Sequence, residues 1–486
     1  MNNKIFVTKY FHIVFWIVVS IFLFIYNYYT VYYGGEMLTD KMKILSWIGI
    51  FIYFGGLFSW KIVNQTIFTP FALWFTSLFI FCYGHFILFS FNSEIPNLVT
   101  NMYSDTILYE AQLFTLYSFL AFLLGALFSI KISLKLKIPK QTNMEFDSAA
   151  KLIGWFLFYI GIIPGVLKHY ENIKVSILYG YSGLFKVKEV KTGFSNIFSV
   201  LDPFLISALF ILLYTYRDNK KIYRIFFFSI LLYIILELIS GNRDIAMPML
   251  VSVAIIDTLL NKKRLKNINW KKIWVYIGLA TIVISAFPAF LKTRNMDNKS
   301  LALFIENYKD IFGADNPFLL VLAEMGFSAR PLIETMQVIP EFYNYHYGET
   351  YYWALTAVFP NLFWDQHPAS IHSNIAGWVK EIMGISYGPG SSLPTEAFYN
   401  FGWWGLLCLI PIGFMIAKLS NLTKFDLENI NPFKLLSVCI FLIFSLTLAR
   451  RGLFDMVRPV TYYCFIPLLL IKFTILEKRR KYKNIN

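Results

Sequence analysis

Long runs of apolar residues, separated by short polar segments, cover most of this chain of 486 residues. A helix that crosses a membrane needs about 20 mostly apolar residues, and about twelve runs reach or approach that length. They centre near 11–33, 44–58, 67–92, 111–130, 149–168, 196–216, 225–240, 245–260, 273–291, 399–418, 434–449 and 457–475. The pattern predicts an all-α, polytopic integral membrane protein with about twelve transmembrane helices.

Composition agrees with this interpretation and excludes a soluble domain. Hydrophobic residues make up 57% of the chain and charged residues 15%, too few polar side chains to cover a soluble surface. The net charge of +15 lies in short clusters between the apolar runs, so it does not indicate nucleic-acid binding. The four cysteines also fall inside apolar runs, which predicts neither a disulfide framework nor a redox pair.

The basic clusters predict the orientation, because Lys and Arg of short loops favour the cytoplasmic side. With the N-terminus inside, the cytoplasmic segments include "KISLKLKIPK", "RDNKKIYR" and the tail "EKRRKYK", and both termini are cytoplasmic. The chain then has three parts. Residues 1–291 hold transmembrane helices 1–9, residues 292–398 form a large extracytoplasmic loop with amphipathic helices, and residues 399–486 hold helices 10–12 and a basic tail.

Arginines gather on the outer side in this topology. Arginine offers a planar fork of donors that suits bidentate phosphate binding, so the group predicts a diphosphate clamp. The residues predicted to bind diphosphate or substrate are Arg243, Arg294, Arg330, Arg451 and Arg458, and Arg450 lies on the same side. Pairing within a helix is the open alternative, because Arg451 stands four residues before Asp455.

One acid and one histidine are candidate bases. Glu396 lies just before a helix that begins "AFYNFGWWG"; an apolar setting favours its neutral form, while a capping role in the first turn is the alternative. His367 lies in "FWDQHPASIH" and is predicted as a base or as a structural loop residue. We predict no metal site there, because Pro368 breaks the helical spacing that a zinc motif needs. The chain has no P-loop or dinucleotide fingerprint, and no cofactor is predicted.

Four segments together resemble the Wzy-type polymerases that join oligosaccharide repeat units of bacterial O-antigen and capsule. They are "GNRDIAMPML", "YGETYYWALTAVFPNLF", "GPGSSLPTEAFYNFGWWG" and "RRGLFDMVRP". The resemblance implies a ligase-like, GT-C-like membrane fold and a metal-independent glycosyltransferase on the outer face of the bacterial inner membrane. It implies transfer of the growing glycan from its undecaprenyl-diphosphate carrier to a new lipid-linked repeat unit.

The resemblance also implies roles for particular residues and partners. Glu396 or His367 would take the proton from the acceptor hydroxyl, and Tyr351, Tyr352 and Trp353 would stack on sugars. Besides membrane lipids and the lipid-linked oligosaccharide, a chain-length regulator is the expected partner. The alternatives are an O-antigen ligase, which shares the architecture and the donor, and a flippase or other transporter for lipid-linked glycan. The charges gather near helix ends rather than at mid-membrane, which disfavours a transporter.

Overall fold

The computed structural model describes most of the chain. The described residues are 2–32, 37–67, 69–91, 98–130, 140–186, 197–240, 242–260, 305–306, 309, 317–361, 364–385, 388–420 and 431–485. Within these ranges the regular structure is helical and no strand occurs. The all-helical prediction is therefore confirmed for the part of the chain that is described.

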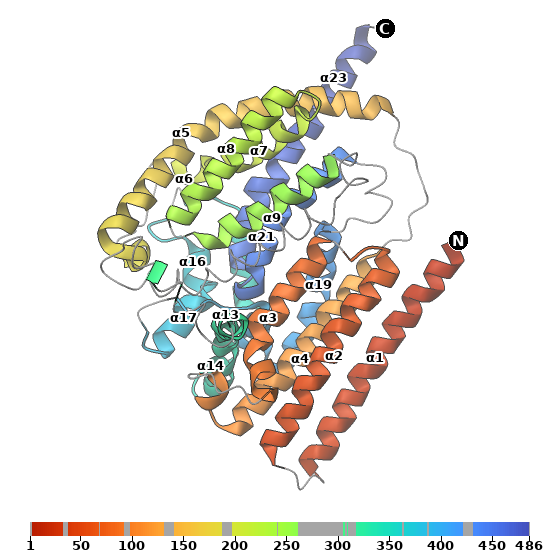
Figure 1. Cartoon of the computed structure of the whole chain (residues 1–486), viewed down its shortest axis with the longest axis vertical. Helices are drawn as coiled ribbons and strands as arrows, with labels where there is room; N and C mark the ends of the chain where they lie inside the picture. Colours follow the sequence, from red (N-terminus) through yellow and green to blue (C-terminus); the bar gives the residue numbers. More distant parts are fainter. Residues whose placement is uncertain are drawn as a thin grey trace.

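The first group of helices packs around a core rich in aromatic residues. Its members are α1 (Asn2–Tyr32), α2 (Leu38–Asn64), α3 (Pro70–Ser90), α4 (Asp105–Ser129) and, from late in the chain, α19 (Gly405–Ser420). Trp16, Trp60 and Trp74 are fully buried among them. Figure 1 shows α1 to α4 side by side in the lower right of the molecule.

The second group of helices has a core of its own. Its members are α5 (Lys140–Lys186), α6 (Ile197–Leu201), α7 (Pro203–Thr215), α8 (Lys220–Ile239), α9 (Arg243–Leu260), α21 (Pro432–Ser445) and α23 (Ile466–Ile485). Phe210, Ile230 and Ile440 lie at the centre of this core. In Figure 1 these helices fill the upper part of the molecule, above α1 to α4.

Short helices from the predicted outer loop and from two hairpins assemble at one end of both groups. They are η1 (Val99–Asn101), α13 (Pro317–Gly326), η3 (Phe327–Ala329), α14 (Arg330–Val338), α15 (Glu349–Thr356), α16 (Pro368–His372), α17 (Ile375–Ile382), α18 (Leu393–Phe401), η4 (Gly402–Trp404), η5 (Leu446–Arg450), α22 (Phe454–Pro459) and the π-helical η6 (Val460–Phe465). His85 of α3 fastens this assembly, because one ring nitrogen bonds the Ala323 carbonyl and the other accepts from the Val99 N–H at 2.9 Å.

The membrane-spanning helices agree closely with the apolar runs. Ten described helices are long and apolar enough to cross a membrane, and they coincide with ten of the predicted runs. The run at 245–260 forms a shorter apolar helix, Ile245–Leu260, and the run at 273–291 lies outside the described residues. The structure is that of a polytopic membrane protein.

The segment that returns to the membrane differs from the prediction in its start and its shape. The predicted helix 399–418 is two helices, and the first of them, α18, already begins at Leu393. Ser392 caps α18 by accepting from the Thr395 N–H at 3.2 Å, and Pro394 favours a helix start. At Gly402, with φ of 58°, the chain turns through η4 into α19. Glu396 therefore lies inside the first turn of a helix rather than before one.

The contact between α4 and α19 is close enough to require glycine. A Cβ on Gly125 would lie 2.0 Å from the Ile410 carbonyl oxygen, and one on Gly413 would lie 2.5 Å from the Phe122 carbonyl oxygen. Backbone atoms cannot yield as a flexible side chain can, so each glycine permits the two helices to approach.

Gly125→Ala should separate α4 from α19 and lower the free energy of unfolding by about 1–3 kcal/mol. Thermal unfolding of the purified protein in detergent measures the effect as a lower Tm. Gly388→Ala is the matched control, because a Cβ there meets nothing within 4 Å. Equal Tm values for Gly125→Ala and the wild type would contradict the proposed contact.

Candidate functional site

The turn that leads into α15 is fixed to α18 by two of its backbone N–H groups. Tyr347 and Gly348 have φ of 46° and 90°, and the left-handed region suits glycine. The Tyr347 N–H donates to the Asn400 carbonyl at 2.9 Å, and the Gly348 N–H donates to Asn400 Oδ1 at 3.0 Å. The first turn of α15 is thereby placed over α18.

A buried carboxylate joins three segments below this turn. Glu396 is fully buried, and its Oε1 accepts from the Thr350 hydroxyl at 2.9 Å. Its Oε2 accepts from the Leu453 N–H, in the hairpin between η5 and α22, at 2.6 Å. The Asn400 amide completes the network by donating to Thr350 Oγ1 at 2.7 Å. Both oxygens of Glu396 are thus engaged in holding α15, α18 and the hairpin together.

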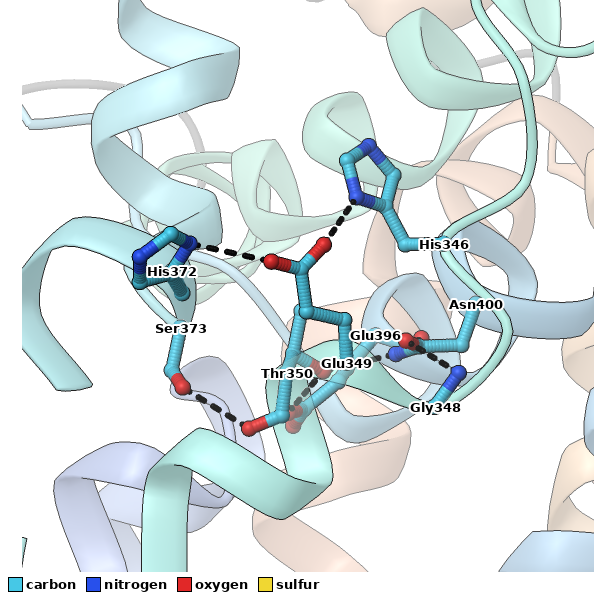
Figure 2. A network of polar contacts seen from close by, with 8 residues as sticks. All are labelled: His346, Gly348, Glu349, Thr350, His372, Ser373, Glu396 and Asn400. Atoms are coloured by element: carbon cyan, nitrogen blue, oxygen red, sulfur yellow. Dashed lines mark hydrogen bonds and ion pairs between the residues drawn. The ribbon is translucent and has the colours of Figure 1, made fainter. Parts of the chain in front are cut away.

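Above the buried network lies a partly exposed group of one glutamate and two histidines. The carboxylate of Glu349 accepts from His346 Nδ1 at 3.0 Å and from His372 Nδ1 at 2.9 Å. Figure 2 shows the two imidazole rings on different sides of this carboxylate, with Thr350, Glu396 and Asn400 beneath it. The hydrogen bond from His346 is the main cause that lowers the pKa of Glu349 below its ordinary value, so the carboxylate is ionised at neutral pH.

Each imidazole also rests on an aromatic ring. His346 stacks on Tyr399 with ring centroids 4.1 Å apart, and His372 stacks on Trp353 at 4.9 Å. Their Nδ1 atoms bond Glu349, and no contact in the described part of the chain engages Nε2 of either ring. A neutral imidazole that donates from Nδ1 to a carboxylate has its Nε2 lone pair free to accept a proton, which is the arrangement of a general base.

The predicted sugar-stacking residues take two different positions. Tyr352 is 66% exposed beside Trp353, with ring centroids 5.2 Å apart, so these two rings flank the histidine group. Tyr351 instead lies beside Phe401, with ring centroids 6.3 Å apart. Its hydroxyl is buried, no hydrogen-bond partner is present among the described residues, and burial raises the pKa of the phenol.

His367 lies in the turn before α16 and uses both ring nitrogens locally. Nδ1 accepts from the Ala369 N–H at 3.1 Å, which caps α16, and Nε2 bonds the Phe359 carbonyl at 3.0 Å. Burial lowers the pKa of the imidazole. A neutral ring with Nε2–H as donor satisfies both contacts. This geometry fits a structural loop residue, because a general base needs a ring nitrogen free to accept a proton.

The described arginines differ in their partners. Arg330 pairs with Glu334 at 3.2 Å and donates to the Tyr103 hydroxyl at 2.7 Å. Arg451 lies 3.8 Å from Asp455, which confirms the pairing that their spacing allowed. Arg458 donates to the carbonyls of Ala357 at 3.1 Å and Phe359 at 3.0 Å. Arg294 and the side chain of Arg243 lie outside the described residues.

The predicted site residues include none of Glu349, His346 and His372. Glu349 follows His346 by three residues in "HYGE", a spacing that brings side chains together on one helical turn, and this was the available signal. His372 is far from both along the chain, so only the fold brings it to them. Among the described residues, no group of three or more His, Cys, Asp or Glu side chains is arranged to hold a metal ion.

Comparison with known proteins identifies the family. The family described as O-antigen polysaccharide polymerase Wzy matches residues 12–481, nearly the whole chain. No curated protein and no solved structure matches the chain. A multi-pass helical architecture and a family match over almost the full length agree with each other, and the chain belongs to the Wzy family of O-antigen polysaccharide polymerases.

Proposed function

We propose that this protein polymerises oligosaccharide repeat units carried on undecaprenyl diphosphate, on the outer face of the bacterial inner membrane. The observation that carries the proposal is the partly exposed group in which the Glu349 carboxylate contacts two histidines, His346 and His372. The group lies in a chain of a polysaccharide polymerase family. The leaving group is a lipid diphosphate, already activated, so the reaction needs neither a nucleotide nor a metal.

In the proposed reaction, His372 is the general base. The acceptor hydroxyl of the new repeat unit attacks the anomeric carbon of the growing glycan, and the bond from that carbon to the diphosphate oxygen breaks. The hydroxyl proton passes to Nε2 of His372, and undecaprenyl diphosphate leaves. Glu349 holds the ring through Nδ1 and stabilises the imidazolium that forms. Tyr352 and Trp353 supply stacking faces for the sugar beside it.

The two residues first predicted as bases have positioning roles in this proposal. Glu396 acts through Thr350, whose neighbour Glu349 carries the histidine pair. His367 and Arg458 both bond the Phe359 carbonyl and hold the turn after α15. Arg330, Arg451 and Arg458 lie in or beside the assembly of short helices. Glu334 and Asp455 pair with the first two, so Arg458, which bonds backbone carbonyls, is the one of the three whose positive charge favours the approach of an anionic lipid carrier.

We infer the same orientation and three-part division that the basic loops predict. Lys9 near the start of α1 donates to the Ile130 carbonyl at the end of α4, and Arg479 near the end of α23 pairs with Glu145 near the start of α5. These basic ends lie opposite the outer assembly, and Figure 1 marks both termini in the upper half of the view. A cytoplasmic location of both termini follows from the positive-inside rule. A separate chain-length regulator stays a prediction.

Deletion of the gene should abolish the ladder of long surface polysaccharide on a gel, while acceptors that bear a single repeat unit remain. Ligation and export are intact in such cells, so only polymerisation is lost. Complementation with the wild-type gene is the control and should restore the ladder. Loss of all repeats from the surface would instead favour a ligase or a flippase.

His372→Asn should lower the polymerisation rate by roughly 10²-fold or more, the usual contribution of a general base. Asparagine can still donate to Glu349 but cannot accept the proton. The measurement is the rate of chain extension with purified protein and lipid-linked repeat units, beside a Tm that should match the wild type. An unchanged rate would remove His372 from the proposed role.

Thr350→Val should leave Glu396 Oε1 and the Asn400 amide without their shared partner, at a cost of about 1–3 kcal/mol per unsatisfied group. We expect a lower kcat with little change in KM, because α15 no longer holds the histidine pair in place. Thr350→Ser keeps the hydroxyl and should restore the rate. A loss of activity in Thr350→Ser equal to that in Thr350→Val would contradict the hydrogen bond as the cause, because serine keeps the hydroxyl.

A further inference from the structure

One arginine of the hairpin before the last helix lacks the partners that engage its neighbours. Arg450 stacks on the Phe81 ring of α3, with the guanidinium carbon 5.6 Å from the ring centroid. The hairpin carboxylate of Asp455 pairs with Arg451, and Glu396 accepts from Thr350 and Leu453. Within the described ranges, no carboxylate pairs with Arg450.

The position of this cation makes its lack of a counter-ion important. Arg450 is the last residue of one candidate membrane span, Pro432–Arg450, and it stacks on α3, which is another. A cation at membrane depth costs free energy unless a partner compensates it, so such residues usually serve a substrate or ion pathway. Stacking on an aromatic face supplies only part of that compensation.

A second unsatisfied group lies beside Arg450. The Ser391 hydroxyl is buried, with the residue only 4% exposed, and it has no hydrogen-bond partner in the described structure. The Ser391 N–H donates to the Arg450 carbonyl at 3.2 Å, which ties the two residues together. A buried hydroxyl normally finds a partner, so its isolation points to a ligand.

A glycine brings these two groups together. Gly390 has φ of 79°, and a Cβ there would lie 3.1 Å from the Arg450 carbonyl and 3.8 Å from Nε and Nη2 of its guanidinium. The guanidinium therefore lies directly against the Gly390 backbone. The segment continues into Ser392, the cap of α18, so the subsite also adjoins the electropositive end of a helix.

We propose that Arg450 and Ser391, placed by Gly390, form a phosphoryl subsite that takes the diphosphate of the lipid-linked glycan. The inference rests on the proposed polymerase function and assigns its donor site to residues distinct from the histidine pair. The guanidinium fork binds two phosphoryl oxygens and the Ser391 hydroxyl donates to a third. In this site the cation also stabilises the negative charge that develops on the departing diphosphate.

The test is binding of farnesyl diphosphate to the purified protein in lipid nanodiscs, measured by isothermal titration calorimetry. We expect Arg450→Ala to raise the Kd at least about 10-fold, as expected when a charged hydrogen-bond donor is lost. Ser391→Ala should raise it several-fold without altering charge. Arg479→Ala is the matched control, because it removes the same charge at the opposite end of the protein, where Arg479 pairs with Glu145.

Inorganic pyrophosphate is the second probe, and it tests whether the site recognises a lipid-linked diphosphate or any free diphosphate anion. Weaker binding of pyrophosphate than of farnesyl diphosphate, with both sensitive to Arg450→Ala, supports a subsite for the lipid carrier. Equal binding of the two probes would overturn the lipid assignment. An unchanged Kd in both Arg450→Ala and Ser391→Ala, or an equal loss in Arg479→Ala, would overturn the subsite.

The calorimetry measures binding and not polymerisation, so the subsite and the proposed polymerase function can fail independently. If deletion of the gene leaves the polysaccharide ladder intact, the polymerase proposal fails whatever the calorimetry gives. If the ladder disappears but Arg450→Ala and Ser391→Ala bind farnesyl diphosphate normally, only the subsite fails. If Arg450→Ala is unstable, Ser391→Ala and Arg450→Lys test the subsite instead. Lysine keeps the positive charge but loses the guanidinium fork, so Arg450→Lys should bind farnesyl diphosphate less tightly than the wild type.

Discussion

The buried carboxylate of Glu396 is the contact on which the assembly of short helices depends. It lies where water does not reach it, and its two oxygens accept from Thr350 of α15 and from the Leu453 N–H of the hairpin. A carboxylate taken out of water is costly unless its oxygens are satisfied. The two donors come from segments far apart in the sequence, so neither segment can move away without leaving the carboxylate unsatisfied.

This buried contact also determines what lies on the surface. Thr350 and Glu349 are consecutive in the first turn of α15, where successive side chains point about 100° apart. With the Thr350 hydroxyl bound inward to Glu396, Glu349 is directed away from the core and toward His346 and His372. Asn400 reinforces the arrangement, because its side chain bonds both Thr350 and the Gly348 N–H that precedes α15. A rigid interior thus positions a partly exposed pair of histidines.

The sequence predicted what depends on local pattern. Ten apolar runs became helices that can span a membrane, and the spacing of Arg451 and Asp455 correctly indicated a pair. It misplaced the start of the helix at Glu396, because the Ser392 cap and Pro394 lie outside the apolar run that marked the helix. It could not assemble Glu349 with His372, since their proximity arises from the packing of α15 against α16. Likewise, the sequence predicted Glu396 as a base or a capping residue, and only the fold brings the Leu453 N–H to its carboxylate.

The arginines show most clearly why a residue type and a topology do not specify a site. In the sequence, Arg450, Arg451 and Arg458 are equivalent members of one basic hairpin. In the structure, Arg451 has a carboxylate four residues away, Arg458 is occupied by two carbonyls of the turn after α15, and Arg450 rests on Phe81 of α3. The first contact is local and can be read from spacing, whereas the other two depend on segments distant in the chain. A cation contributes to anion binding only to the extent that the protein has not already neutralised it, so the nonlocal contacts decide which arginine remains available for a phosphate.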